Sequence, residues 1–206
     1  GSPRQSTGRS RLMFGAVGTA IVILAVAVAV ALSLSKRSAP GASAPHTASS
    51  APSSSVSALA SRQAAAVNTL LTTSSATRHS LVGAIRAVRN CAHLPRAAAQ
   101  IRHVVNQRSA EYNHALALST AAMVKGAIVK ADLIAALRHS LEADRDYLTW
   151  ARHQLNSGCR PAAQSGAYQA AQNADRQANA SKAAFVQAWN QVAARYRVQR
   201  KSPGDI

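Results

Sequence analysis

Aromatic and acidic side chains are scarce in this sequence of 206 residues: aromatics make up 4%, and only seven residues are Asp or Glu. With so few large side chains, the core must be built from Ala, Leu, Val and Ile. Each of these buries little area, so long helices are needed to accumulate enough burial. The seven acids face 24 Lys and Arg, and the net charge of +17 predicts attraction to anionic surfaces. A solvated basic face in an arginine-rich chain is the simpler explanation of the same charge.

Catalytic and cofactor motifs are also missing. The sequence has no nucleophile elbow, phosphate-binding loop, dinucleotide fingerprint, haem-attachment motif or Cys/His zinc spacing. Glu111 and His114 have the Glu-x-x-His spacing of di-metal helix bundles, but those sites need further glutamates, and Glu142 is the only other one. We therefore predict no enzyme activity, no metal and no cofactor. Interleaved aromatics of the single-strand-binding kind are absent, which argues against nucleic acid as a partner.

One long stretch, Leu12 to Leu34, contains neither a charge nor a proline. As a helix it would be about 34 Å long, enough to cross the hydrocarbon core of a bilayer. It is longer than the apolar core of a cleaved secretion signal, and Arg4, Arg9 and Arg11 precede it. The sequence thus predicts a cytoplasmic tail (1–11), a single-pass signal anchor in membrane lipid (12–34) and an extracytoplasmic C-terminal part. Small residues in the run would also allow a homo-oligomer through helix pairing.

Two further regions follow the apolar run. Residues 35–56 are rich in Ser, Ala and Pro with almost nothing to bury, which predicts a flexible, disordered stalk. Helical periodicity begins at Ser57, and it predicts a helical domain over 57–200 followed by a C-terminal tail, 201–206. The first helix is expected from about Ser57 to Asn90, and Pro95 and Pro161 suit the first turns of the second and fourth helices.

The boundary between the second and third helices is weakly marked, because only Gly126 interrupts a helix-favouring run from Ala115 to Ala131. An unbroken helix from Pro95 to Ser157 would be roughly 95 Å long, which is unusual for a small domain. We therefore place a turn at Gly126.

A turn at Gly126 predicts an all-α fold, an up-down-up-down four-helix bundle whose first and third connections lie at the same end. Those connections carry Cys91 and Cys159, which are the only cysteines. We expect one disulfide between them, which suits an extracytoplasmic domain and would stabilise the fold by about 4 kcal/mol.

Charged residues interrupt the apolar faces of the predicted helices. Arg108, Asp144 and Asp175 occupy seam positions, and folding about Gly126 sets Asp144 opposite Arg108. Folding about the cysteine connections brings Arg78 to the level of Asp175. We predict a buried ionic layer of two arginines and two aspartates, because burial of any one of these charges alone would be strongly unfavourable. The layer is either a device that fixes the register of an Ala-rich bundle or a pocket for a small anion or polar ligand.

Two basic surfaces and two tryptophans complete the candidate contacts. Trp150 falls off the apolar seam, which predicts a half-buried or contact residue, whereas Trp189 lies in the seam and is expected in the core. Basic side chains repeat along the third helix and cluster near the C-terminus. The predicted contacts to an anionic surface are Arg138, Arg145, Arg152, Arg195, Arg197, Arg200 and Lys201.

Together these features predict a membrane-anchored, extracytoplasmic helical module for binding or interaction, which contacts anionic envelope polymers, lipid headgroups or a partner protein through its basic surface. The alternative is a small-ligand sensing or carrier module that uses the polar layer. In outline the bundle resembles the extracytoplasmic four-helix sensor modules of bacterial membrane receptors, although no motif identifies a family.

Overall fold

The computed structural model describes residues 51–206, and this part of the chain is helical without a strand. Four long helices, α1 (Ala51–Arg89), α2 (Leu94–Ala117), α3 (Gly126–Ser157) and α4 (Gly166–Ala193), are joined by short connections. Two 3₁₀ segments, η1 (Ala162–Gln164) and η2 (Pro203–Asp205), precede and follow α4. The prediction of an all-α fold with four helices is confirmed.

The predicted membrane anchor, residues 12–34, lies outside the described residues, as does most of the predicted stalk. Among residues 51–206, no helix is long and apolar enough to cross a membrane. The first helix begins at Ala51, six residues before the start expected near Ser57. Pro52 lies in its first turn, where a proline costs no helical hydrogen bond.

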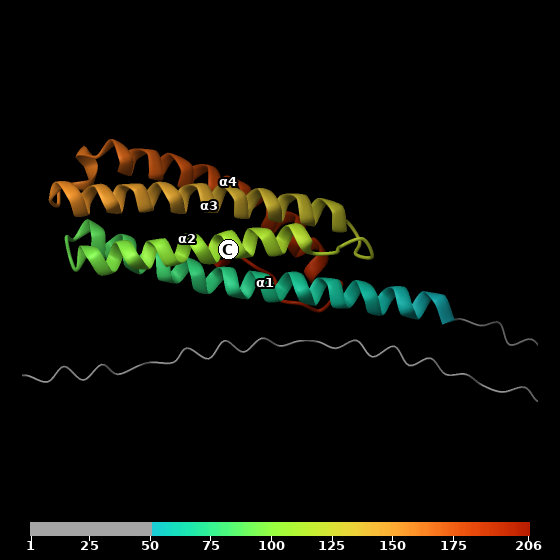
Figure 1. The fold of residues 1–206 in the computed structure, drawn as a ribbon. Coiled ribbons are helices and arrows are strands. Elements are labelled where there is room, and N and C mark those ends of the chain that lie inside the picture. The colour runs from blue at the N-terminus through green and yellow to red at the C-terminus, as the bar shows by residue number, and fades with distance from the viewer. Residues whose placement is uncertain (1–50) are drawn as a thin grey trace, which may run out of the picture. The chain divides into compact units, whose positions relative to one another are not determined.

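Each helix runs antiparallel to the one before it, so that the chain goes back and forth along one axis (Figure 1). Neighbours in sequence, α1 with α2, α2 with α3 and α3 with α4, pack against each other. The connections 90–93 and 158–165 lie at one end of the bundle, and the connection 118–125 lies at the other. We call these the disulfide end and the turn end.

A turn separates α2 from α3, and Gly126 is the first residue after it. A Cβ atom at Gly126 would stand 1.9 Å from the carbonyl oxygen of Thr120, far inside van der Waals contact. The preceding Lys125 has a φ of 55°, in the left-handed region. Gly126 is therefore needed for the close approach of the connection to the start of α3, and the turn lies on its N-terminal side.

A disulfide joins Cys91 to Cys159 across the disulfide end, with their Cα atoms 5.8 Å apart. This pairing is confirmed. Cys91 and His93, in the connection between α1 and α2, have φ values of 55° and 48°, which turn the chain back within a few residues.

The core has two parts. The turn-end core contains Leu71, Leu137, Phe185 and Trp189 from three helices, and Ile206 from the C-terminal tail packs into the same cluster. The tail is held on α4 by hydrogen bonds: Trp189 donates its indole N–H to the carbonyl oxygen of Gln199 at 3.0 Å. The η2 segment contacts both α1 and α4. At the turn end, the tail thus fills the seam between these two helices.

The disulfide-end core contains Val88, Ile101, Leu148 and the two aromatic residues Tyr147 and Trp150. Trp150 is fully buried, so the expectation of a half-buried or contact residue is wrong. It lies 4.8 Å from Tyr168 of α4, measured between ring centroids. Since α3 packs against both α2 and α4, its buried face is wider than a single seam.

Candidate functional site

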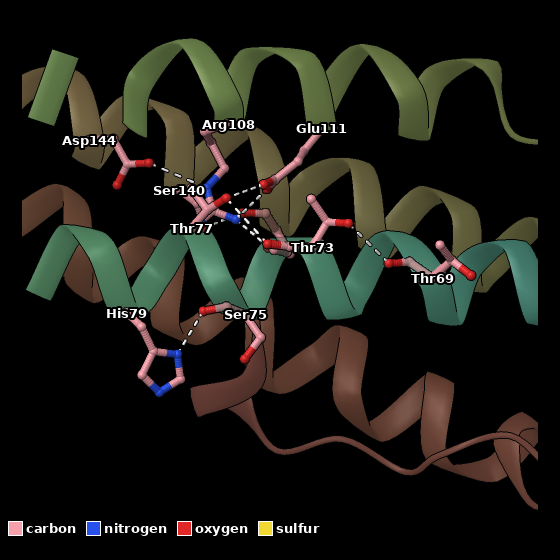
Figure 2. A network of polar contacts seen from close by, with 11 residues as sticks. Thr69, Thr73, Ser75, Thr77, His79, Arg108, Glu111, Ser140 and Asp144 are labelled. Atoms are coloured by element: carbon pink, nitrogen blue, oxygen red, sulfur yellow. Dashed lines mark hydrogen bonds and ion pairs between the residues drawn. The ribbon is translucent and has the colours of Figure 1, made fainter. Parts of the chain in front are cut away.

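Arg108 of α2 is the centre of a buried polar network. Its side chain is only 1% exposed. Its Nε–H donates to Oδ2 of Asp144 on α3 at 3.3 Å. Its Nη1 donates to Oε2 of Glu111, one turn along the same helix, at 2.8 Å, and to the hydroxyl of Ser74 on α1. Figure 2 shows the guanidinium between the two carboxylates. One cation is therefore shared by two acids, which is the arrangement that makes a buried charge tolerable.

Glu111 extends the network to α1. Its Oε1 accepts a hydrogen bond from the hydroxyl of Thr77 at 2.5 Å. Thr77 and Ser74 lie one turn apart on α1, so one face of this helix supplies both hydroxyls. The polar groups of three helices thus satisfy each other in an otherwise apolar section of the bundle.

A cleft of about 250 Å³ opens beside this network, in the half of the bundle toward the disulfide. Its α1 wall carries both apolar and basic residues, its floor includes Arg108, Ser140 and Asp144, and α4 contributes Asp175 and Lys182. The cleft therefore lies between α1 and α4, in the seam that the C-terminal tail fills at the other end. For scale, a cavity of roughly 150 Å³ holds a benzene molecule.

The four predicted layer residues all line this cleft, but they are not equivalent. Arg108 and Asp144 are buried and paired, whereas Arg78 and Asp175 are half-buried and form no ion pair with each other within 4 Å. Asp175 instead accepts a hydrogen bond from Asn179, one turn along α4, at 3.4 Å. The structure thus contains a closed pair on the floor and two unpaired charges on the walls.

Lys182 is a functional candidate that sequence reasoning missed. It is only 3% exposed, lines the cleft from α4, and forms no hydrogen bond or ion pair within the described part of the chain. Burial lowers the pKa of Lys182 to about 8, and the positive charges of Arg78 and Arg108 act in the same direction. The carboxylates of Asp144 and Asp175 oppose this shift. The cleft therefore holds a largely buried lysine that makes no direct hydrogen bond or ion pair within the described residues.

Burial also raises the pKa of two further groups in the cleft, the carboxyl group of Asp144 and the hydroxyl group of Tyr147. It raises the pKa of Asp144, and the neighbouring guanidinium of Arg108 counteracts this rise. Burial raises the pKa of Tyr147 as well, and its hydroxyl accepts a hydrogen bond from Gln172 at 2.6 Å. Tyr147 is consequently a neutral hydrogen-bonding group in the cleft at any physiological pH.

The expected basic surfaces are only partly assembled. Three arginines of α3 are exposed, and they form the α3 ridge: Arg138, Arg145 and Arg152. Three arginines after α4 are exposed as well: Arg195, Arg197 and Arg200. Lys201 does not belong to this exposed set, because it is only 8% exposed and its Nζ donates to Oε1 of Gln199 at 2.8 Å. The folded tail accounts for this difference, since it packs Lys201 beside Asn190.

The Glu-x-x-His spacing at Glu111 and His114 does not assemble a metal site in the described residues, where no group of three or more potential ligands occurs. Glu111 is buried against Arg108 and Thr77, while His114 is exposed. The role of Glu111 is therefore that of the second counter-ion of Arg108. Its position three residues after Arg108 is the sequence signal that could have found it.

Comparison of the chain with models of protein families, with curated proteins and with solved structures finds no match.

Proposed function

We propose that this protein is a membrane-anchored helical module that binds a small, anion-bearing polar ligand in the cleft between α1 and α4. The observation that carries the proposal is Lys182, a buried amine on the cleft wall with no partner in the described chain. A cation with so little contact to water is unfavourable, and a ligand carboxylate or phosphate would supply a counter-ion in direct contact, which Asp144 and Asp175 do not provide.

The charges around the cleft favour an anion. Five cationic side chains line it, against the two carboxylates of Asp144 and Asp175. Arg108 is already shared by Asp144 and Glu111, so the unpaired cations are those of the walls: Arg78, Arg86, Arg89 and Lys182. The α1 wall also offers Leu81, Val82 and Ile85 to an apolar part of the ligand. A small amphipathic acid matches this combination in charge and size.

The cellular context is part of the proposal. The uncharged run 12–34 is long enough to anchor the chain, and a disulfide suits an oxidising compartment outside the cytoplasm. A sensing or carrier module displayed at the outer face of a cell membrane satisfies both observations. The predicted stalk would then separate the cleft from the bilayer.

Thermal unfolding of the full chain in detergent micelles tests the proposal. Benzoate, citrate and glycerol 1-phosphate are the acidic probes, and benzyl alcohol and glycerol are the matched uncharged probes. At least one acid is expected to raise Tm by several degrees, because a ligand at 100 times its Kd stabilises the folded state by about 2.7 kcal/mol. The uncharged probes are expected to have no effect.

Lys182→Met should abolish the shift, whereas Lys125→Met should keep it. Lys125 is an exposed lysine at the turn end, where it hydrogen-bonds Gln191 and does not line the cleft. Equal shifts in both variants, or equal shifts with acids and alcohols, would contradict binding in this cleft.

A second candidate function rests on the exposed arginines of α3. Arg138, Arg145 and Arg152 follow each other at intervals of seven residues and are all exposed. Such a ridge favours binding to an anionic envelope polymer. Binding to polyphosphate should then weaken steeply with salt, and replacement of the three arginines by Gln should reduce both the affinity and the salt dependence. Unchanged binding in this triple variant would assign the attraction to the net charge of +17 alone.

A further inference from the structure

A second cleft, of about 260 Å³, lies at the start of α4, where η1 leads into the helix. It is lined from α3 by His153 and Gln154, from the connection by Arg160, and from the first turn of α4 by Gly166 and Ala167. No carboxylate lines it. This cleft is separate from the one between α1 and α4, with which it shares no lining residue.

Gln154 is an incompletely satisfied side chain on the wall of this cleft. It is only 1% exposed, and its Oε1 accepts a hydrogen bond from the backbone N–H of Arg160 at 2.7 Å. Its Nε2, in contrast, is buried without a partner within the described residues. A buried donor without an acceptor costs about 1–3 kcal/mol, so the position calls for an acceptor from outside the described chain.

The start of α4 adds further donors. Ser165 caps the helix, because its hydroxyl oxygen accepts from the N–H of Tyr168 at 3.3 Å. The N–H groups of Gly166 and Ala167 form no hydrogen bond within the described part of the chain. The first turn contains no acidic residue that could offset the positive end of the helix. Unpaired N–H groups at a helix start form a ready anion site.

We propose that this cleft is an oxyanion-binding site, in which a phosphate or carboxylate group accepts hydrogen bonds from Gln154 Nε2 and from the N–H groups of Gly166 and Ala167. Arg160 and His153 line the same cleft, and the guanidinium of Arg160 adds positive charge. The ligand chemistry follows from these groups: the buried atom without a partner is the amide nitrogen of Gln154, and the free backbone groups of the first turn are N–H donors, so the ligand must present acceptors.

NMR of the full chain, labelled with ¹⁵N in detergent micelles, tests this site without any variant. Sodium phosphate and sodium acetate are titrated separately at constant ionic strength. We expect saturable shifts of the backbone signals of Gly166 and Ala167 and of the side-chain amide signals of Gln154. A preference for phosphate would identify a phosphate ligand, and a preference for acetate a carboxylate one. Shifts that are absent, or that do not saturate with either anion, would overturn the proposal.

A matched pair of variants provides a second test. Gln154→Glu keeps the acceptor for Arg160 but replaces the unpaired donor by a carboxylate oxygen, so at least a tenfold loss of anion affinity is expected. Gln177→Glu makes the same charge change on an exposed position of α4, three turns away from the cleft, and should bind as the wild type does. Equal affinities of the two variants would overturn the assignment, even if both fold normally.

Discussion

The seam between α1 and α4 is treated differently at its two ends. At the turn end the C-terminal tail fills it, and Ile206 is as fully buried as Phe185 and Trp189 of the helices. At the disulfide end the same seam is an open cleft whose walls carry unpaired cations. An apolar gap can be filled by a chain's own side chains, whereas an open gap lined by charges is filled by water or by a ligand of opposite charge. This difference is the reason why we propose the open end as the binding site.

Of the changes that test this difference between the two ends, replacement of Arg108 should cause the largest loss of stability. Arg108→Met leaves Asp144 and Glu111 buried without their shared guanidinium, and loss of one partner of a buried pair typically costs 3–5 kcal/mol. Urea unfolding would measure the loss. Arg102→Met, at an exposed position of the same helix, is the control and should change stability by no more than about 0.5 kcal/mol. Similar losses in the two variants would contradict a structural role of the network.

Removal of the disulfide should cause the second largest loss of stability, and this loss should concentrate at the open end. The bond closes a loop with a sequence separation of 68, for which the chain-entropy estimate is roughly 4 kcal/mol. The double variant Cys91→Ala, Cys159→Ala should therefore unfold at a lower urea concentration, with a loss of up to about 4 kcal/mol. Hydrogen exchange should increase first near the connections 90–93 and 158–165. Faster exchange confined to the turn end would contradict this placement.

Truncation of Ile206 tests the filled end. Ile206→Ala creates a cavity in the turn-end core, and such a change typically costs 2–5 kcal/mol. We expect the lower part of this range, since the tail can relax toward the cavity. Ligand binding at the open end should persist in the folded variant. Ile128→Ala, on an exposed side chain of α3, should leave stability nearly unchanged, so a comparable loss in both would show that the tail does not seal the seam.

Lys182 gives the smallest expected effect on stability, and the size of this effect depends on pH. Because its folded pKa is lowered to about 8, the unfolded chain binds more protons than the folded one between about pH 8 and the ordinary lysine value of 10.5. Wild-type stability should therefore gain from this group as pH rises through that window. Lys182→Met should be more stable than the wild type at pH 7, on the order of 2 kcal/mol, and the difference should shrink toward pH 10.5. Urea unfolding at pH 7 and pH 10 measures it, and a constant difference would contradict a buried, unpaired amine.

Helix periodicity and punctuation were sufficient to predict the four helices and the disulfide. The position of Gly126 predicted a turn, and symmetric folding about it placed Arg108 opposite Asp144, the two residues that the structure pairs. These inferences depend on sequence distances that regular helices translate into heights along the bundle. Such inferences predict contacts correctly between helices that follow each other along the chain.

The missed features depend on the shape of the bundle rather than on sequence distance. Lys182 lies seven residues after Asp175 and seven before Trp189, so its seam position was readable, but a lysine there is ordinarily solvated. The packing of the tail into the core was not predicted, because its short sequence carries no periodicity. Neither the width of the buried α3 face nor the seam between first and last helices can be derived from one helix at a time.

The disulfide also determines the covalent topology of the domain. It closes α2 and α3 into a ring, from which α1 and α4 leave as two arms. A single backbone cut within the connection 118–125 would open this ring without releasing a fragment. Such nicked protein would migrate as one chain until a reducing agent divides it in two. Sulfur chemistry, rather than the peptide backbone alone, thus keeps the two walls of the cleft in one molecule.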